Sequence, residues 1–383
     1  MAEDHKQDIV IVTNGFQTDY MWNLVNGISK HCRVLLICSN DLARLTFDSN
    51  VVVNNLRGDV NSNVAFRKKI ARLLRYYRRL FSFIAKSRAK VLHIQWLRVY
   101  VIDGIFLTLF ARARGKRVIY TAHDVLPHDK DTLTNRLLFR MIYKLQNEII
   151  AHTNFIRKRL INEFGLRESK VHFIEHGVYE VEEKKEISVQ KAREKYGIEA
   201  NDFVILFFGR IARYKGVELV ASILDQIDSD RQRVRLIIAG RASKDYEADF
   251  MRFYESVKSD KIIPRFGFIE DQELEWLFKA SSLTVLPYQE ASQSGVLFMS
   301  YAFGIPVVAP RLGAFPDYVS EPETGILYHP DSENGLLNAL LEARRHYGQP
   351  DESRRDHIKS FAHKNFAWDS SGKRLYSLYM KNQ

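Results

Sequence analysis

The sequence has few cysteines and no long apolar run. Cys32 and Cys38 are the two cysteines among 383 residues, and they stand at opposite ends of one predicted strand. Extended geometry separates them by about 20 Å, which is too far for a disulfide between them. This cysteine usage fits a reducing cytoplasm. No run of about 18 apolar residues is present, and residues 1–8 are mostly polar, so we expect neither a membrane-spanning helix nor a signal peptide.

The chain also lacks the dinucleotide-binding fingerprint. Gly15 follows the first predicted strand, residues 8–14, but no Gly-x-Gly-x-x-Gly pattern does, and this disfavours an ordinary NAD site. With 46% hydrophobic and 27% charged residues the chain has a globular composition, and 383 residues are too many for one core. We therefore expect two domains, with the charged segment 179–189 as the best linker candidate.

Predicted strands and helices alternate along most of the sequence. The predicted strands span 8–14, 33–38, 91–95, 116–122, 148–152, 170–174, 203–208, 233–239, 262–266, 283–286, 305–309 and 325–328. Most of these runs are separated by stretches with helical periodicity. Such alternation is typical of an α/β fold with parallel sheets and helices on both faces.

Residues 283–310 form the best-defined unit of this kind. The unit begins with a short apolar run, as in a strand buried on both faces, and residues 295–303 are apolar nearly all round, as in a buried helix. Gly304 and Pro306 end that helix before the next strand. The polar loop 290–295 thus lies where a parallel strand ends and a helix begins. Open α/β sheets bind ligands there, and helix N-termini attract phosphate.

Residues 66–90 carry ten Lys or Arg residues and no acid. Apolar and aromatic residues recur between them at helical spacing, so a basic amphipathic helix is predicted. In one interpretation its apolar stripe packs on a sheet and its charges are only solvated. In the other the helix also packs inward, but its basic face contacts an anionic membrane surface, which places a cytoplasmic protein at the inner membrane face. We expect no nucleic-acid partner, because no DNA- or RNA-binding motif accompanies the charge.

Basic and aromatic residues follow several predicted strands. Arg210 and Lys215 come after the strand 203–208, and both could bind a diphosphate, Arg through its fork and Lys as a point charge. His123 follows the strand 116–122, where a histidine could bind substrate or phosphate, or could serve as a structural cap. A flat base could rest near Phe268. These residues indicate a site for a phosphorylated ligand at the ends of the strands.

Several segments, in order, resemble motifs of the retaining glycosyltransferases of family 4. Residues 208–216 (Phe-Gly-Arg-Ile-Ala-Arg-Tyr-Lys-Gly) resemble the phosphate loop of that family, and residues 302–309 (Ala-Phe-Gly-Ile-Pro-Val-Val-Ala) resemble its Gly-x-Pro-Val-Val turn. Residues 120–124 (Tyr-Thr-Ala-His-Asp) resemble the strand that brings a His-Asp pair to the active site. The segment 174–178 is similar to a Pro-Asn-Gly-Val loop with histidine in place of asparagine, and the Phe-Ala-Trp helix at 366–368 is also similar.

The resemblance implies the GT-B architecture, an α/β fold of two Rossmann-like domains with parallel sheets facing a central cleft. Residues 1–182 would form the acceptor-binding domain, residues 183–362 the nucleotide-sugar-binding domain, and residues 363–383 a helix that crosses back to the first domain. The implied enzyme is a metal-independent hexosyltransferase that needs no cofactor and retains anomeric configuration. Its expected partners are a UDP- or GDP-sugar donor and a sugar or lipid-linked acceptor, in polysaccharide or glycolipid assembly.

The resemblance also assigns the site residues. Arg210 and Lys215 would neutralise the leaving diphosphate. His123 would contact the sugar or help the leaving group, and Glu290 would reach the sugar. The residues assigned to donor binding are Gly15, Gly209, Arg241, Phe268, Gln293, Ser294, Gly295 and Val296. No residue is assigned to a metal.

One departure from the family concerns two glutamates that usually stand eight positions apart before the turn. Ala291 and Met299 occupy those positions here, and Glu290 is one position off. Met299 cannot hold a ribose hydroxyl as a carboxylate does. This departure motivates one alternative to an active transferase, a catalytically inactive glycosyltransferase-like partner subunit. A second alternative is a related GT-B enzyme, a nucleotide-sugar epimerase.

Overall fold

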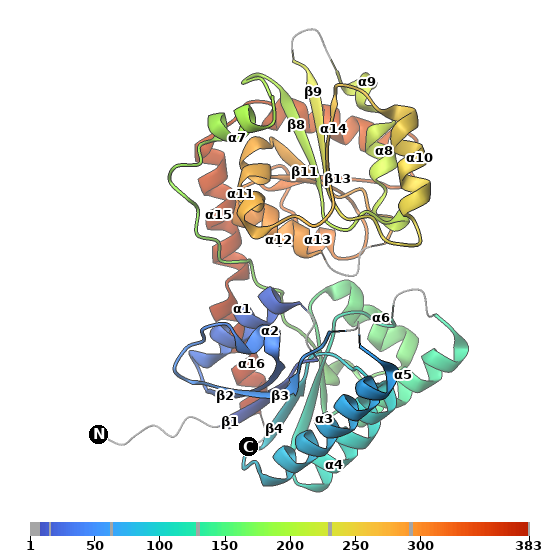
Figure 1. The fold of residues 1–383 in the computed structure, drawn as a ribbon, viewed down its shortest axis with the longest axis vertical. Coiled ribbons are helices and arrows are strands. Elements are labelled where there is room, and N and C mark those ends of the chain that lie inside the picture. Colours follow the sequence, from blue (N-terminus) through green and yellow to red (C-terminus); the bar gives the residue numbers. More distant parts are fainter. Residues whose placement is uncertain are drawn as a thin grey trace. The chain divides into compact units, whose positions relative to one another are not determined.

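The computed structural model describes residues 8–14, 17–61, 64–127, 131–228, 232–290 and 294–381. The chain divides into two compact units, residues 1–177 with 366–383, and residues 178–365 (Figure 1). The boundaries drawn from the sequence at 182 and 362 both fall inside the second unit. Each unit contains one parallel sheet with helices, so the predicted fold class is confirmed.

The first unit is built on a seven-stranded parallel sheet with the order β3-β2-β1-β4-β5-β6-β7. Its strands are β1 (Asp8–Val12), β2 (Arg33–Ser39), β3 (Val51–Gly58), β4 (Val91–Ile94), β5 (Arg117–Ala122), β6 (Glu148–Ala151) and β7 (Val171–Phe173). Residues of β1 alternate between two hydrophobic clusters, because Ile9 and Ile11 join one and Val10 and Val12 join the other. The edge strand β3 was not predicted, since its asparagines and arginine interrupt the apolar run.

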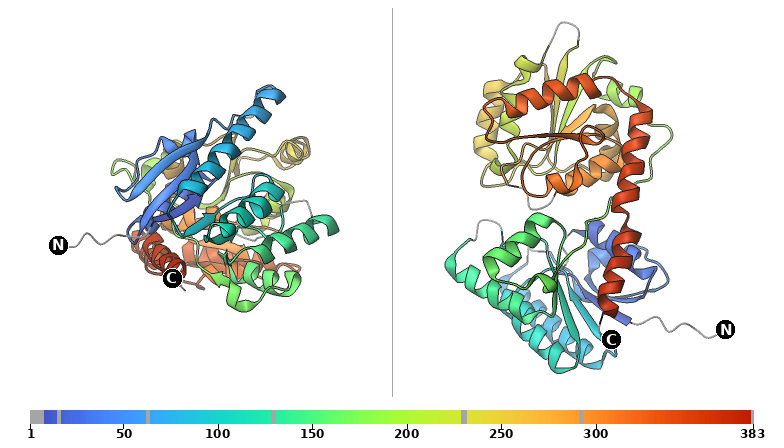
Figure 2. Two further views of the ribbon diagram at one scale, coloured as in Figure 1. Left: turned by 90° about the horizontal axis from the view of Figure 1, so that it is seen from below. Right: turned by 180° about the vertical axis from the view of Figure 1, so that it is seen from behind.

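Helices cover both faces of this sheet (Figures 1 and 2). They are α1 (Thr18–Ser29), α2 (Asn40–Ala43), α3 (Phe66–Lys86), a π-helical turn (Ile102–Phe106) continuing into α4 (Leu107–Ala113), α5 (Leu133–Leu145), α6 (Asn154–Phe164), the 3₁₀ turn η2 (Glu168–Lys170) and α16 (Trp368–Met380). Helices α3 to α6 pack on one face, and α1 and α16 pack on the other. The predicted helix 66–90 ends early, at Lys86, because Ser87 has an extended backbone that leads toward β4.

The last helix of the chain, α16, is an integral part of the first unit. It packs so closely on α1 that a Cβ atom at Gly27 would lie 2.5 Å from the carbonyl oxygen of Trp368, and one at Gly372 would lie 2.3 Å from the carbonyl oxygen of Gly27. Glycine at both positions therefore lets the two helix backbones touch. The buried Tyr379 near the end of α16 reaches the centre of the sheet, where its hydroxyl lies 2.7 Å from Nδ1 of His93.

The second unit has a six-stranded parallel sheet with the order β10-β9-β8-β11-β12-β13. Its strands are β8 (Phe203–Phe208), β9 (Val234–Gly240), β10 (Ile262–Phe266), β11 (Leu283–Val285), β12 (Val307–Pro310) and β13 (Gly325–Tyr328). Its helices are α7 (Val189–Lys195), the 3₁₀ turn η3 (Arg213–Lys215), α8 (Val217–Ala221), α9 (Leu224–Ile227), α10 (Glu247–Val257), α11 (Asp271–Ala280), α12 (Gly295–Ala302), α13 (Phe315–Tyr318), α14 (Gly335–Tyr347) and α15 (Glu352–Phe366).

The strand–loop–helix–strand unit predicted for residues 283–310 is confirmed as β11, α12 and β12. Ser294 caps α12, since its hydroxyl oxygen accepts a hydrogen bond from the backbone N–H of Leu297 at 3.4 Å. Gly304 ends the helical segment with a φ angle of 69°. Both cysteines are buried, and neither forms a disulfide. Within the described residues, no helix is at once long and apolar enough to cross a membrane.

Candidate active site

Three neighbouring strands of the second unit end in a glycine with a positive φ angle. The φ angles of Gly209, Gly240 and Gly267, after or at the ends of β8, β9 and β10, are 109°, 146° and 118°. The backbone N–H of Gly209 donates to the carbonyl oxygen of Ala239 at 2.9 Å, and that of Gly267 donates to Gly240 at 3.0 Å. A Cβ atom at Gly240 would lie 1.8 Å from the carbonyl oxygen of Gly209. The carboxyl edge of the sheet is therefore a strip of backbone that a ligand can approach closely.

Lys215 stands beside this strip, at the end of η3. Its Nζ lies 3.4 Å from the ring centroid of Tyr288 and 5.3 Å from that of Tyr214, so aromatic faces stabilise the cation. The pKa of Lys215 is lowered to about 8, chiefly by burial, with Tyr214 raising it and the Arg210 guanidinium lowering it. An anion bound beside these two cations would relieve their mutual repulsion.

Tyr288 and Gln289, which follow β11, contact the turn that contains Lys215, and Tyr288 also contacts the start of α12. The Tyr288 ring, which lies under the Lys215 ammonium group, is buried. Its hydroxyl lies 3.5 Å from the hydroxyl of Ser294, the cap of α12. The backbone N–H of Gln289 donates to the carbonyl oxygen of Tyr214 at 2.8 Å. These contacts fix the turn that contains Lys215 and the N-terminus of α12 to one short segment, residues 288–289. A phosphate group at this edge could then interact with both.

Four of the predicted donor-binding residues, Gly209, Val296, Arg241 and Phe268, lie around the same edge. Gly209 lies next to Val296, whose Cγ2 would be 3.4 Å from a Cβ atom at Gly209. Arg241 lies over Phe268, with its Cζ 5.9 Å from the ring centroid, and Phe268 is 67% exposed. A flat ring exposed beside the glycine strip offers a stacking surface for a base.

Four other predicted site residues, one of them in the first unit, are considered separately. A Cβ atom at Gly295 would lie 3.1 Å from the Tyr179 hydroxyl, so a side chain at this start of α12 would require a small shift of that tyrosine. Glu290 is exposed, at the end of a described range. Gln293 and Gly15 lie outside the described residues, as does Ala291.

In the first unit, His123 belongs to a buried polar network at the carboxyl ends of β4 to β7. Its Nε2 lies 3.3 Å from Oε1 of Gln95, which also lies 3.2 Å from the hydroxyl of Tyr20. Its ring stacks on Trp96, with 4.2 Å between the centroids and 6° between the planes. His123 is therefore held at a set position and angle by partners from other elements.

Gln95 determines which nitrogen of His123 carries the proton. Its amide nitrogen lies 3.1 Å from Nε2 of His93 and donates to it, which directs the amide oxygen to His123. Because an amide oxygen only accepts, Nε2 of His123 is the donor in this contact. On its far side, Nδ1 of His93 donates to the Tyr379 hydroxyl. The chain Tyr379–His93–Gln95 thus orients His123.

The other histidines of this network are neutral at pH 7. Burial lowers the pKa of His93 to about 3, that of His152 to about 4 and that of His176 to about 3. Nδ1 of His152 donates to the carbonyl oxygen of Ile174 at 2.7 Å, so its Nε2 accepts from the Tyr20 hydroxyl at 2.8 Å. The network can therefore position hydroxyl groups without introducing charge. Within the described ranges, no three His, Cys, Asp or Glu side chains are placed to hold a metal ion.

Two family models match the chain. The model described as Glycosyltransferase Family 4 matches residues 14–180, and that described as Glycosyl transferases group 1 matches residues 202–346. The chain belongs to the family 4 glycosyltransferases.

Individual relatives are distant. An uncharacterized glycosyltransferase of Methanocaldococcus jannaschii is 23% identical over 236 residues, which are 61% of this chain and 59% of the relative. A D-inositol 3-phosphate glycosyltransferase of Pseudarthrobacter chlorophenolicus is 28% identical over 182 residues, 47% of this chain and 43% of that one. The matches thus span about half the length of these curated relatives. The crystal structure of Anabaena HepE in complex with UDP and glucose has a TM-score of 0.73 at 15% identity, covering 97% of this chain and 99% of that one, which shows the shared GT-B fold.

The departure of this family 4 member from the usual acidic pair is visible in α12. Met299 is partly buried and packs against the hydrophobic cluster that contains Phe278 and Phe303. It fills space in the core and presents no group that binds a hydroxyl. The described part of the site therefore offers the cations Lys215, Arg210 and Arg241 together with the Ser294 hydroxyl and backbone groups.

Sequence reasoning missed several residues that the structure places in these clusters. Gln95 and Trp96 directly follow β4, and His152 directly follows β6, so their position after a strand was a usable signal. Tyr288 comes three residues after the end of β11. Tyr20 lies on α1 and carried no such signal, because nothing in its local sequence separates it from an ordinary buried aromatic.

Proposed function

We propose that this chain is a retaining, metal-independent glycosyltransferase that moves a sugar from a nucleoside diphosphate sugar to an acceptor hydroxyl, in polysaccharide or glycolipid assembly. The observation that carries the proposal is the pair of cations Lys215 and Arg210 beside a glycine-ended sheet edge and the capped start of α12. Such a site suits a diphosphate, and the family membership supports the class of reaction. A UDP complex of a distant structural relative, HepE, supports a nucleotide donor.

The proposed transfer needs no carboxylate nucleophile. The bond between the anomeric carbon and the phosphate oxygen breaks, and the acceptor oxygen attacks from the same face. The departing phosphate takes the proton of the acceptor hydroxyl, and its growing charge is met by Lys215, Arg210 and the backbone N–H groups at the start of α12. In this proposal Phe268 and Arg241 hold the base, while His123 contacts the sugar. Glu290 is proposed to reach the sugar from the loop before α12.

The test is an assay of nucleoside diphosphate release from UDP- and GDP-sugars, with and without sugar and lipid-linked acceptors. A transferase releases the diphosphate faster when its acceptor is present. An epimerase would convert the sugar nucleotide without release, and an inactive partner subunit would do neither. Absence of release with every donor and acceptor pair would contradict the proposal.

We expect Gln95→Leu to lower kcat/KM by roughly 10- to 100-fold. The buried N–H of His123 loses its acceptor, an effect of about 1–3 kcal/mol, and the ring is then free to take the other tautomer. The readout is nucleoside diphosphate release, with thermal unfolding to monitor folding. Gln146→Leu is the matched control, because Gln146 is also a buried amide of the first unit but bonds to Gly104 and Thr108. An equal loss of activity in both variants would contradict the positioning role.

We also propose that α3 contacts an anionic membrane surface. Phe66, Ile70 and Leu74 are spaced by four residues on its first turns and are 74%, 42% and 67% exposed. These apolar side chains lie among basic residues, so they can enter the headgroup region of a bilayer.

Neutralising three cations of α3, as Arg67→Gln, Lys68→Gln and Lys69→Gln together, is expected to reduce flotation with vesicles that contain phosphatidylglycerol. Each basic residue near such a surface contributes about 1 kcal/mol, so the partition coefficient should fall more than about 100-fold. The matched control neutralises the exposed Lys184, Lys185 and Lys244 of the second unit. If both triple variants float like the wild type, the proposed contact is wrong.

A further inference from the structure

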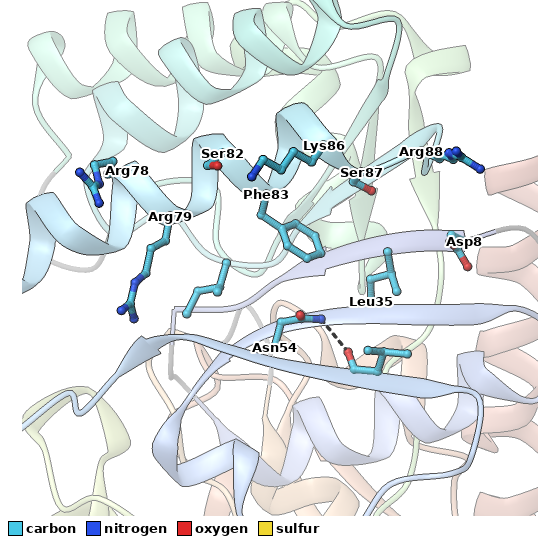
Figure 3. Close-up of a pocket in the computed structure, with 12 residues that line it drawn as sticks. Asp8, Leu35, Asn54, Arg78, Arg79, Ser82, Phe83, Lys86, Ser87 and Arg88 are labelled. Atoms are coloured by element: carbon cyan, nitrogen blue, oxygen red, sulfur yellow. Dashed lines mark hydrogen bonds between the residues drawn. The ribbon is translucent and has the colours of Figure 1, made fainter.

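A groove with a volume of about 790 Å³ opens between α3 and the strands β2 and β3 (Figure 3). Its walls include Leu35 from β2, Val52 and Leu56 from β3, and Phe83 from α3. All four apolar side chains are only partly buried, and Figure 3 shows Phe83 pointing from the helix toward the strands. Because β3 is the edge of the sheet, the groove is open along one side.

The groove lies away from the histidine network of the same unit. Its strand residues come from β1, β2 and β3, at one end of the strand order, and they include Asp8, the first residue of β1; Arg88, just before β4, also lines it. His93 is the third residue of the four-residue strand β4, and His123, His152 and His176 follow the last residues of β5, β6 and β7. In a parallel sheet the first and last residues of the strands lie at opposite edges. The groove is therefore a separate site.

Four basic side chains line the groove together with these apolar residues. Arg78, Arg79, Lys86 and Arg88 line the groove, and Figure 3 shows Arg78 and Arg88 toward its two ends. Arg79 and Lys86 are seven residues apart, which is about two helical turns, so both project from the same flank of α3. Asp8 is the acid among the lining residues, and its Oδ1 lies 3.8 Å from Nη1 of Arg33.

We infer that this groove binds one molecule of an anionic phospholipid. The phosphate would lie at Arg79 and Lys86, and an acyl chain would cover Leu35, Leu56 and Phe83. A free phosphate or a nucleic-acid backbone would use the cations but leave the apolar floor in water, whereas a phospholipid satisfies both. The volume lies within the usual range for small-molecule sites. The inference deepens the proposed membrane contact of α3 and does not depend on the proposed transfer reaction.

The test uses the full chain and monomeric dihexanoyl phosphatidylglycerol below its micelle concentration, with calorimetry for affinity and native mass spectrometry for stoichiometry. The wild type is expected to bind one lipid per chain. Ser82→Trp places a large ring in the groove from an exposed position and keeps every charge, and we expect binding to be lost. Ser82→Ala is the matched control and should bind as the wild type does. Equal binding by both variants would overturn the proposal.

A second pair of variants tests the charges. Arg79→Gln with Lys86→Gln should weaken binding roughly 30-fold, because each removes a contact to the phosphate. Arg67→Gln with Lys69→Gln makes the same change of charge on the same helix outside the groove, and should leave monomer affinity within about twofold, since solvated charges are screened. Equal losses in the two double variants would show a diffuse electrostatic effect and overturn the site.

Two further ligands separate the parts of the phospholipid. Glycerol phosphate has the anionic group without acyl chains, and dihexanoyl phosphatidylcholine has the chains without net charge. Both should bind at least tenfold more weakly than phosphatidylglycerol, and comparable affinity for either would overturn the proposal. Nucleoside diphosphate release without vesicles should be unchanged in the groove variants, so failure of the groove is distinguishable from failure of the proposed transferase. If the variant with Arg67→Gln, Lys68→Gln and Lys69→Gln loses vesicle flotation but still binds monomeric phosphatidylglycerol, the groove is a lipid site distinct from the rest of the α3 surface.

Discussion

Replacing Lys215 with methionine is expected to lower kcat/KM for nucleoside diphosphate release about 100- to 1000-fold, the effect of removing one preorganised group from a developing negative charge. Methionine keeps the apolar stem that lies against Tyr288 but lacks the cation. Because the charge on the leaving phosphate grows during the reaction, kcat should fall more than donor affinity. Single-turnover release from a UDP- or GDP-sugar, together with donor titration, measures the two quantities separately.

Arg213→Met is the matched control for this result. Arg213 lies two residues earlier on the same 3₁₀ turn, but its guanidinium bonds to Asp249 at 2.8 Å and lies over Tyr246. The Arg213→Met variant loses the same charge as Lys215→Met but leaves the proposed anion site intact. Because an exposed ion pair contributes little, its activity should stay within about threefold of wild type. Equal loss of activity in the two variants would mean that Lys215 contributes only to the overall positive charge and does not contact the leaving phosphate.

The lowered pKa of Lys215 gives this prediction a pH signature. In the free protein the ammonium group loses its proton as the pH rises through about 8, so donor affinity should fall over that range. Folding responds in the opposite direction. The unfolded chain holds this proton up to the ordinary value of 10.5, so between about 8 and 10.5 it binds more protons than the folded chain, and stability rises with pH across that window. Lys215→Met should lack this contribution to both trends.

Gly240→Ala is expected to destabilise the second unit by about 4 kcal/mol or more, an effect reserved for severe steric conflicts. A φ angle of 146° is strained for any residue with a side chain, and the added Cβ would lie 1.8 Å from the carbonyl oxygen of Gly209. That oxygen belongs to the backbone, so relief requires β8 and β9 to separate at the edge that carries Arg210. Donor binding should be lost together with protection of the β8 and β9 amides in hydrogen exchange.

Gly267→Ala provides the comparison on the next strand. Its φ angle of 118° is similarly strained, but a Cβ atom there would meet no described atom within 4 Å. We expect a loss of about 1–2 kcal/mol from the backbone alone, with weaker donor binding because the methyl group occupies the open side of the edge. Hydrogen exchange that shows equal destabilisation in the two variants would contradict the close approach of β8 and β9.

Much of the fold was readable from local pattern. Alternating apolar runs and amphipathic stretches predicted parallel sheets, and Gly304 and Pro306 marked the end of α12, because such signals act over a few residues. The edge strand β3 escaped prediction, since strand formation there depends on pairing with β2. Arg210 and Lys215 were found because they follow a strand in a recognisable loop.

By itself, then, the sequence determined the α/β class, the family resemblance and the cationic loop, all of which depend on residues close together in the chain. Only the tertiary structure decided that Gln95 orients His123 and that the Tyr288 ring lies against Lys215. It also decided that glycines at the ends of three strands stand side by side at one edge of the sheet. It also decided which apolar residues of α3 are covered, because Leu80 meets the sheet while Phe66 does not. Residues far apart in sequence become neighbours only when the strands pair and the helices pack, and burial depends on whether a partner surface is present at that place.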